Sequence, residues 1–145
     1  MSGAMIPPAA QTPRGTTILI VEDDKEIGNF LQTLIEEETP YQPVVISDSR
    51  LALETAQQLH PNLLLLDYRL PGMNGIELYD RLQAIDNLRN IPAIMMSATL
   101  PVQELEQRGI FRLRKPMDIG SVIRMITHAL ATSEEWQLFQ QQLYR

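Results

Sequence analysis

Short aliphatic runs alternate in this chain with stretches whose apolar residues recur every three or four positions, and this alternation limits the fold more than any other feature. The runs resemble strands that are covered on both faces, and they lie at residues 18–21, 44–46, 63–66, 94–96 and about 110–114. Such a repeat of strand and helix predicts a parallel sheet with crossover helices. We therefore expect an α/β fold, a doubly wound five-stranded parallel sheet within a three-layer sandwich.

The stretches between the runs carry helix signals. Asp24 is a candidate N-cap of the first helix, and Ser49 is the expected cap of the second. Apolar residues at helical spacing predict a third helix over 76–85 and a last one over 119–130. The fourth helix has room only at 102–108, so it should be short.

The composition argues against several functional classes. Lys and Arg number 12 against 18 Asp and Glu, and a net charge of −6 disfavours binding to the phosphate backbone of a nucleic acid. The chain has no cysteine, which rules out disulfides and fits a reducing compartment. No apolar run approaches the roughly 20 residues that span a bilayer. We expect a cytoplasmic protein with no nucleic-acid and no membrane partner.

The two ends of the chain are expected to lie outside the compact domain, which we place at residues 16–131. Residues 1–15 contain three prolines among small residues and predict a disordered tail or a vector-derived remnant. Residues 132–145 predict a Gln-rich helical extension with an apolar stripe of Trp136, Phe139 and Leu143. The stripe can pack on its own domain, form a homodimer through the tail or the last helices, or lead to a missing output domain.

Polar residues follow four of the predicted strands at the point where each strand ends: Glu22, Asp23, Asp67, Ser97 and Lys115. Each has a structural explanation of its own, as a helix cap, a turn residue or a solvated strand end. In a parallel sheet, however, the carboxyl ends of the strands lie at one edge, which is where such folds bind ligands. We expect these side chains to converge there.

Three carboxylates at neighbouring strand ends require a cation, because two unit charges 4 Å apart repel by about 4 kcal/mol at an effective dielectric constant near 20. An all-oxygen ligand set suits a hard ion such as Mg²⁺. Lys115 provides a second positive charge. Such a site can bind the oxygens of a phosphoryl group, with Asp67 as a plausible nucleophile.

The motifs at these positions resemble the receiver domains of two-component response regulators, the CheY-like proteins. The resemblance covers about residues 17–131 and rests on Ile-Leu-Ile-Val-Glu-Asp-Asp at 18–24, Leu-Leu-Asp-Tyr-Arg-Leu-Pro-Gly-Met-Asn-Gly at 65–75, Ser-Ala at 97–98 and Lys-Pro at 115–116. It implies a flavodoxin-like fold with strand order 2-1-3-4-5.

The resemblance also implies a role for each acidic residue. Asp67 is the expected phosphoacceptor, and Glu22 and Asp23 form the acidic pair. Mg²⁺ is expected to be bound by Asp23, Asp67 and the main-chain carbonyl of Arg69, with Glu22 acting through water. The donor is then a sensor histidine kinase or a histidine phosphotransfer protein, and the downstream target is an unknown protein.

The remaining roles implied by the resemblance concern the switch. Ser97 is the expected hydroxyl that turns toward the phosphoryl group, Lys115 the amine that binds it, and Lys115–Pro116 a cis peptide bond. The resemblance further implies that Arg69 and Thr99 tune the lifetime of the phosphoryl group. The protein is expected not to be an enzyme, beyond catalysing its own phosphorylation and dephosphorylation.

The chain departs from the family pattern between Ser97 and Lys115, which are 18 positions apart, about one helical turn closer than is usual. Arg112 stands three residues before the lysine, where the family has a switching aromatic residue. Phe111 is one position away and should face the opposite side of the sheet unless a bulge intervenes. We expect an altered output surface.

Two alternatives to a phosphorylated signalling domain stay open. One is a receiver-like interaction module with an altered or phosphorylation-independent switch. The other is a Mg²⁺-dependent phosphohydrolase built around Asp67, which is disfavoured because Arg69 stands where a second acid would serve as general acid.

Overall fold

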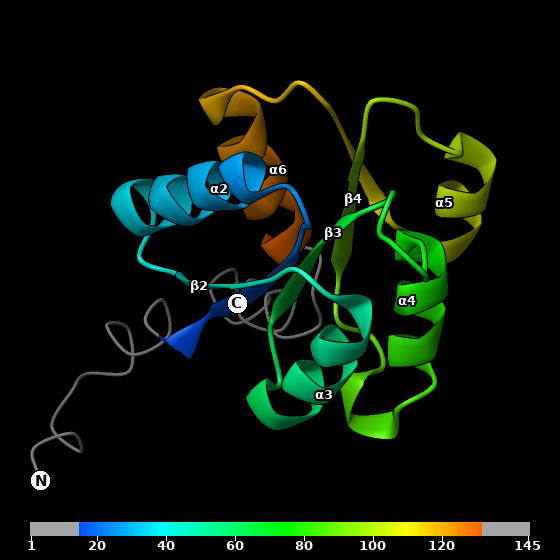
Figure 1. Cartoon of the computed structure of the whole chain (residues 1–145). Coiled ribbons are helices and arrows are strands. Elements are labelled where there is room, and N and C mark those ends of the chain that lie inside the picture. The colour runs from blue at the N-terminus through cyan, green and yellow to red at the C-terminus, as the bar shows by residue number, and fades with distance from the viewer. Residues whose placement is uncertain (1–14, 132–145) are drawn as a thin grey trace, which may run out of the picture.

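The computed structural model describes residues 15–131, which form one parallel sheet with helices on both faces (Figure 1). The strands are β1 (Thr17–Val21), β2 (Gln42–Ile46), β3 (Leu63–Asp67), β4 (Ala93–Ser97) and β5 (Phe111–Arg114). Their order across the sheet is β2-β1-β3-β4-β5, and every neighbouring pair is parallel. The predicted fold class and strand order are confirmed.

Between residues 15 and 131, five helices connect the strands and a sixth, α6, follows the last strand: α2 (Lys25–Glu38), α3 (Ser49–Leu59), α4 (Gly75–Gln83), the 3₁₀ helix η2 (Asp86–Leu88), α5 (Val102–Arg108) and α6 (Ile119–Ala131). The helices α2 and α6 cover one face of the sheet, and α3, α4 and α5 cover the other (Figure 1). The result is the three-layer sandwich expected from the alternation of runs.

The central strand β3 shows why the aliphatic runs are continuous. Leu64 and Leu66 belong to the core beneath α3, α4 and α5, whereas Leu63 and Leu65 belong to the core beneath α2 and α6. All four side chains are at most 1% exposed. Successive side chains of a strand point to opposite faces, so a strand between two helical layers must be apolar throughout.

Two helix starts test the cap predictions. Asp24 caps α2, and its Oδ1 accepts hydrogen bonds from the main-chain N–H groups of Glu26 and Ile27 at 2.9 and 3.2 Å. The prediction that Ser49 caps the second helix is wrong. Asp48 is the N-cap of α3, and the buried Ser49 is the first helical residue, with its hydroxyl donating to the carbonyl of Met73 at 3.2 Å.

Other boundaries shift by a few residues. The third helix ends at Gln83, so Ile85 lies outside it and precedes η2. The strand β2 begins two residues earlier than expected, and β5 begins one residue later. The short fourth helix, α5, has the predicted bounds.

The predictions for residues 1–14 and 132–145, including the apolar stripe of Trp136, Phe139 and Leu143, lie outside the described residues. The domain boundaries at 16 and 131 therefore stay predictions. Between residues 15 and 131, none of the helices is long and apolar enough to cross a membrane.

Candidate functional site

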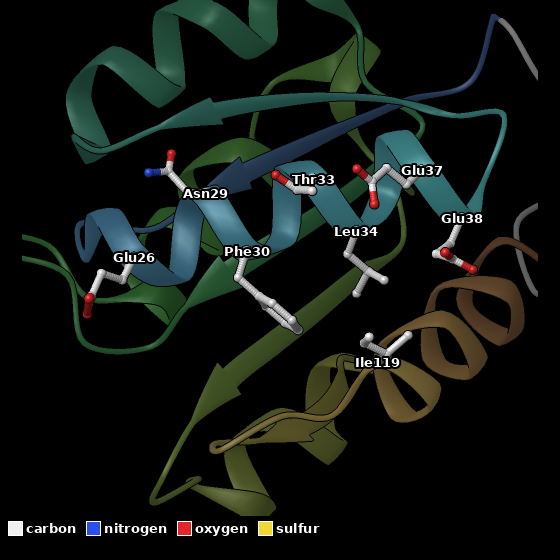
Figure 2. Close-up of a pocket in the computed structure, with 8 residues that line it drawn as sticks. All are labelled: Glu26, Asn29, Phe30, Thr33, Leu34, Glu37, Glu38 and Ile119. Atoms are coloured by element: carbon white, nitrogen blue, oxygen red, sulfur yellow. The ribbon is translucent and has the colours of Figure 1, made fainter.

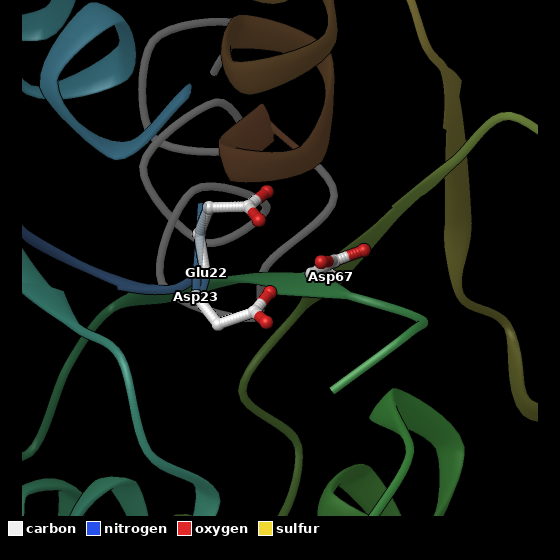
Figure 3. Close-up of side chains that lie close together, drawn as sticks. All are labelled: Glu22, Asp23 and Asp67. Atoms are coloured by element: carbon white, nitrogen blue, oxygen red, sulfur yellow. The ribbon is translucent and has the colours of Figure 1, made fainter. Parts of the chain in front are cut away.

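Three acidic side chains lie together where β1 and β3 end, as Figure 3 shows. One carboxylate oxygen from each of Glu22, Asp23 and Asp67 lies within 4.8 Å of the others. Glu22 and Asp67 are 2% and 4% exposed, whereas Asp23 is open to solvent. The cluster thus has two buried members and one on its rim, and it offers oxygen ligands only.

Lys115 reaches this cluster from the segment that follows β5. Its Nζ lies 2.9 Å from Oε1 of Glu22 and 3.3 Å from Oδ1 of Asp67. The other carboxylate oxygen of Glu22 accepts a hydrogen bond from the main-chain N–H of Asp24 at 3.1 Å. Lys115 therefore lies beside the acidic residues, as predicted.

The electrostatics of Glu22 and Lys115 reflect this crowding. Burial raises the pKa of the Glu22 carboxyl to about 7, against the opposing hydrogen bonds from Lys115 and the amide of Asp24. Desolvation would lower the pKa of Lys115, but its bonds and charge interactions with Glu22 and Asp67 outweigh this and raise it. The single positive charge of Lys115 therefore does not balance the carboxylates that surround it. An additional cation at the cluster would favour the ionised form of Glu22.

Asp67 is positioned by a close approach of α4 to the end of β3, which sequence reasoning missed. The main-chain N–H of Gly75 donates to the carbonyl of Tyr68 at 2.9 Å. A Cβ at Gly75 would lie 2.6 Å from the carbonyl oxygen of Asp67 and 3.0 Å from Cα of Tyr68. The sequence signal for it is the capping box of Asn74 and Glu77, which marks a helix start directly beside β3.

Ser97 is the last residue of β4 and is 2% exposed. Its register partner across β4 and β5 is Arg114, and its carbonyl accepts a hydrogen bond from the amide of Lys115 at 3.0 Å. Its hydroxyl accepts a hydrogen bond from the amide of Thr99 at 3.3 Å. The peptide bond between Lys115 and Pro116 is cis, as the resemblance implied.

Arg69 is an exposed residue of the loop after β3. Its amide donates to Oδ1 of Asp67 at 3.2 Å, so the backbone here holds the carboxylate in place. The role of its carbonyl as a metal ligand, and the assigned roles of the other site residues, stay predictions.

The departure from the family pattern in β5 has a clear structural basis. The register of β4 and β5 is regular across Phe111, Arg112 and Leu113. Phe111 and Leu113 pack in the core beneath α2 and α6, and the Phe111 ring meets His128 edge-on with a centroid separation of 5.1 Å. Arg112 is exposed, 4.0 Å from Glu106 of α5. Phe111 therefore does not substitute for an aromatic residue at 112.

A shallow groove lies elsewhere, along α2 and the start of α6 (Figure 2). Its volume is about 390 Å³, and Phe30, Leu34 and Ile119 form its apolar part, while Glu26, Glu37 and Glu38 are among the polar residues that border it. It shares no residue with the carboxylate cluster and belongs to no predicted site.

Comparison with known proteins agrees with the geometry. Residues 18–127 match the family described as the response regulator receiver domain. Sporulation initiation phosphotransferase F of Bacillus subtilis (strain 168) is 35% identical over 109 residues, 72% of this chain and 86% of that protein. The DNA-binding response regulator MtrA of Mycobacterium tuberculosis (strain H37Rv) is 37% identical over 81 residues, 56% of this chain but only 34% of MtrA.

Solved structures share the fold. Chemotaxis protein CheY4 of Vibrio cholerae superposes with a TM-score of 0.73 at 22% identity, over 79% of this chain and 98% of CheY4. A second neighbour is the receiver domain of sensor histidine kinase PA1611 from Pseudomonas aeruginosa PAO1, whose structure has a magnesium ion coordinated in the active site cleft. It superposes with a TM-score of 0.72 at 24% identity, over 81% of this chain and 99% of the PA1611 domain. With the family match over most of the sheet and the acidic cluster at its edge, the chain belongs to the response regulator receiver domains.

Proposed function

We propose that Asp67 is the phosphoacceptor of this receiver domain, taking a phosphoryl group from a phosphohistidine of a sensor histidine kinase or a histidine phosphotransfer protein. The observation that carries the proposal is the position of the Asp67 carboxylate, grouped with those of Glu22 and Asp23 and 3.3 Å from the ammonium of Lys115. A carboxylate with this combination of neighbours can react with phosphorus while its surroundings offset the charge of the phosphoryl oxygens.

Mg²⁺ fits this donor set because all three side chains offer oxygen and one of them, Asp23, is open to solvent. Asp23 and Asp67 would hold the ion together with the main-chain carbonyl of Arg69, and Glu22 would contact it through water. When bound, Mg²⁺ supplies positive charge that offsets the carboxylates and the phosphoryl oxygens.

In the transfer, a carboxylate oxygen of Asp67 forms the new O–P bond while the P–N bond to the donor histidine breaks. The histidine nitrogen keeps the bonding electron pair and takes up a proton. Lys115 is already directed at the acceptor carboxylate and is placed to donate to a phosphoryl oxygen. Water later cleaves the acyl phosphate, releasing inorganic phosphate and restoring Asp67. The domain thus acts on itself and turns over no separate substrate.

The signal would pass on through Ser97. Its hydroxyl is bonded to the amide of Thr99, and turning toward a phosphoryl group on Asp67 requires that bond to be exchanged for a charge-assisted one. The new anion, of about −1.5 to −2 charge, would then bias two arrangements of the segment after β4. The downstream partner would be a protein that binds one arrangement better.

The test is incubation of the protein with Mg²⁺ and acetyl phosphate, followed by intact-mass measurement. We expect the wild type to gain one phosphoryl group and Asp67→Asn to gain none. Asp48→Asn is the matched control, because asparagine also caps helices and Asp48 lies at the start of α3, outside the cluster. Turnover of p-nitrophenyl phosphate, measured in parallel, should be absent.

An interaction module with an altered switch is the second candidate. The exposed Arg112 and the seven-residue α5 favour it, since both change the surface that follows Ser97. Absence of covalent modification with any phosphodonor would select this module, and sustained ester turnover would select a phosphohydrolase instead.

A further inference from the structure

The helix α5 is the shortest α-helix between residues 15 and 131, and few of its own residues anchor it. It has seven residues and one buried side chain, Leu105. Its N-cap, Pro101, provides no side-chain hydrogen bond. A helix this short does not form on local propensity, so contacts with the rest of the domain must hold it.

A bidentate ion pair supplies such a contact. Nε and Nη2 of Arg108, at the end of α5, lie 2.8 and 2.9 Å from the two carboxylate oxygens of Asp80 on α4. Nη1 of Arg108 also donates to the carbonyl of Glu104 at 3.0 Å, and the hydroxyl of Tyr79 donates to the carbonyl of Arg108 at 3.4 Å. We call this Asp80–Arg108 pair the α4–α5 clamp. Its two-point geometry fixes the orientation of the guanidinium as well as its position.

The α4–α5 clamp joins two of the helices that follow site residues. The helix α4 begins at Gly75, whose amide donates a hydrogen bond to the carbonyl of Tyr68. Tyr68 is the residue that directly follows Asp67. The helix α5 begins only five positions after its own site residue, Ser97. Movement of Ser97 toward Asp67 therefore pulls on α5, and the α4–α5 clamp resists at the other end of that helix.

We propose that the α4–α5 clamp holds α5 in the arrangement of the unmodified protein and so sets how readily the segment after Ser97 rearranges when Asp67 is phosphorylated. This inference rests on the proposed function, of which it names a regulatory element. Asp80 and Arg108 are positioning residues and lie outside the carboxylate cluster. The pair of Arg112 with Glu106 is longer, at 4.0 Å, and does little to fix the orientation of α5.

The experiment measures amide hydrogen exchange of residues 98–109 in the whole chain, before and after modification by acetyl phosphate and Mg²⁺. The variants are Arg108→Gln, Asp80→Asn and their combination. Arg89→Gln is the matched control, because Arg89 forms a comparable 2.8 Å bond with Asp86 that joins neither α4 to α5 nor any site residue. Intact mass, recorded on the same samples, reports the extent of modification.

We expect modification of the wild type to speed exchange in this segment. In the unmodified protein, either single change should speed it by roughly three- to fivefold, as expected for loss of a partly exposed bidentate pair. The double variant should exchange no faster than the single ones, because both remove the same interaction. The further increase on modification should shrink in all three variants and stay unchanged in Arg89→Gln.

The outcomes separate the two proposals. Full modification with the same exchange ratio in Arg108→Gln and wild type would overturn the inference and leave Asp67 as acceptor. Additive effects in the double variant would also overturn it. If the wild type were not modified at all, the proposed function would fail, and the inference would fail with it because there would be no phosphorylation to regulate.

Discussion

The two halves of the site edge are built differently. On the side of β1 and β3, Glu22 and Asp67 are buried, Asp24 caps the adjoining helix, and Gly75 brings α4 against the strand end. On the side of β5, a seven-residue helix without a side-chain cap is held by a surface ion pair, and Arg112 is exposed. The first half is rigid and charged, and the second is lightly anchored.

This difference indicates that chemistry and response occupy separate parts of the fold. A phosphoryl-accepting site needs fixed oxygens, because small displacements weaken electrostatic stabilisation. A responding segment needs two arrangements of similar free energy, and few buried contacts make that easier. The departure from the family pattern at Arg112 therefore affects the responding half and leaves the acidic cluster intact.

The largest effect is expected from Lys115→Ala, because Lys115 reaches from the segment after β5 to the buried carboxylates of the rigid half. Removing the ammonium leaves the buried carboxylates of Glu22 and Asp67 facing each other, and we expect a loss of about 2–3 kcal/mol in the free energy of unfolding without Mg²⁺. Added Mg²⁺ should restore part of it, and acetyl phosphate should no longer modify the protein. Urea denaturation measures the stability, with Lys25→Ala at the exposed start of α2 as control. A denaturation midpoint equal to that of Lys25→Ala would contradict the assigned role.

Gly75→Ala should be the next most damaging change. The added methyl group would meet main-chain atoms of Asp67 and Tyr68, which cannot move aside as a flexible side chain can. We expect a loss of about 2 kcal/mol in stability together with weaker modification of Asp67. In Gly120→Ala the methyl group meets only the side chain of Arg124, so that variant should be as stable as the wild type or slightly more stable. Equal melting temperatures for the two variants would refute the close approach of Gly75 to the main chain of Asp67 and Tyr68.

Substitution of the adjacent residues Asp23 and Asp24 should change the free energy of unfolding in opposite directions. Asp23→Ala removes one charge from the acidic cluster and should raise the metal-free stability by about 0.5–1 kcal/mol. Asp24→Ala removes the cap of α2 and should lower it by about 1 kcal/mol. Thermal unfolding in chelator measures both. Added Mg²⁺ should stabilise Asp24→Ala but not Asp23→Ala, and the same sign for both substitutions would count against the cluster.

The smallest effect is expected at the lightly anchored half. Arg112→Gln breaks only a 4.0 Å contact with Glu106 between two exposed side chains, and stability should change by less than about 0.5 kcal/mol. The rate of modification by acetyl phosphate should be unchanged, because Arg112 has no contact with the acidic cluster. A loss as large as that of Gly75→Ala would show that this half is not lightly anchored.

Local sequence signals were sufficient for the sheet and the acidic cluster. Continuous aliphatic runs identify buried parallel strands, and polar residues at their carboxyl ends must share an edge, as Glu22, Asp67 and Lys115 do. The cap of α3 was misassigned because Asp48 and Ser49 are adjacent residues that both favour caps, and only the backbone decides between them.

Contacts between distant segments could not be predicted in the same way. Asp80 and Arg108 are separated by 28 positions, and their pairing depends on how α4 and α5 pack, which no periodicity encodes. The need for glycine at position 75 likewise arises from the main chain of Asp67 and Tyr68 beside it. Such features depend on tertiary distances rather than on residue type.

Chemical identification of the modified residue tests directly whether Asp67 is the phosphoacceptor. Borohydride reduction of the protein after treatment with acetyl phosphate converts an aspartyl phosphate to homoserine, which peptide mass spectrometry locates. We expect homoserine at position 67 in the presence of Mg²⁺ and none in the presence of a chelator. Homoserine at another aspartate, or the same yield at position 67 with the chelator, would contradict this expectation.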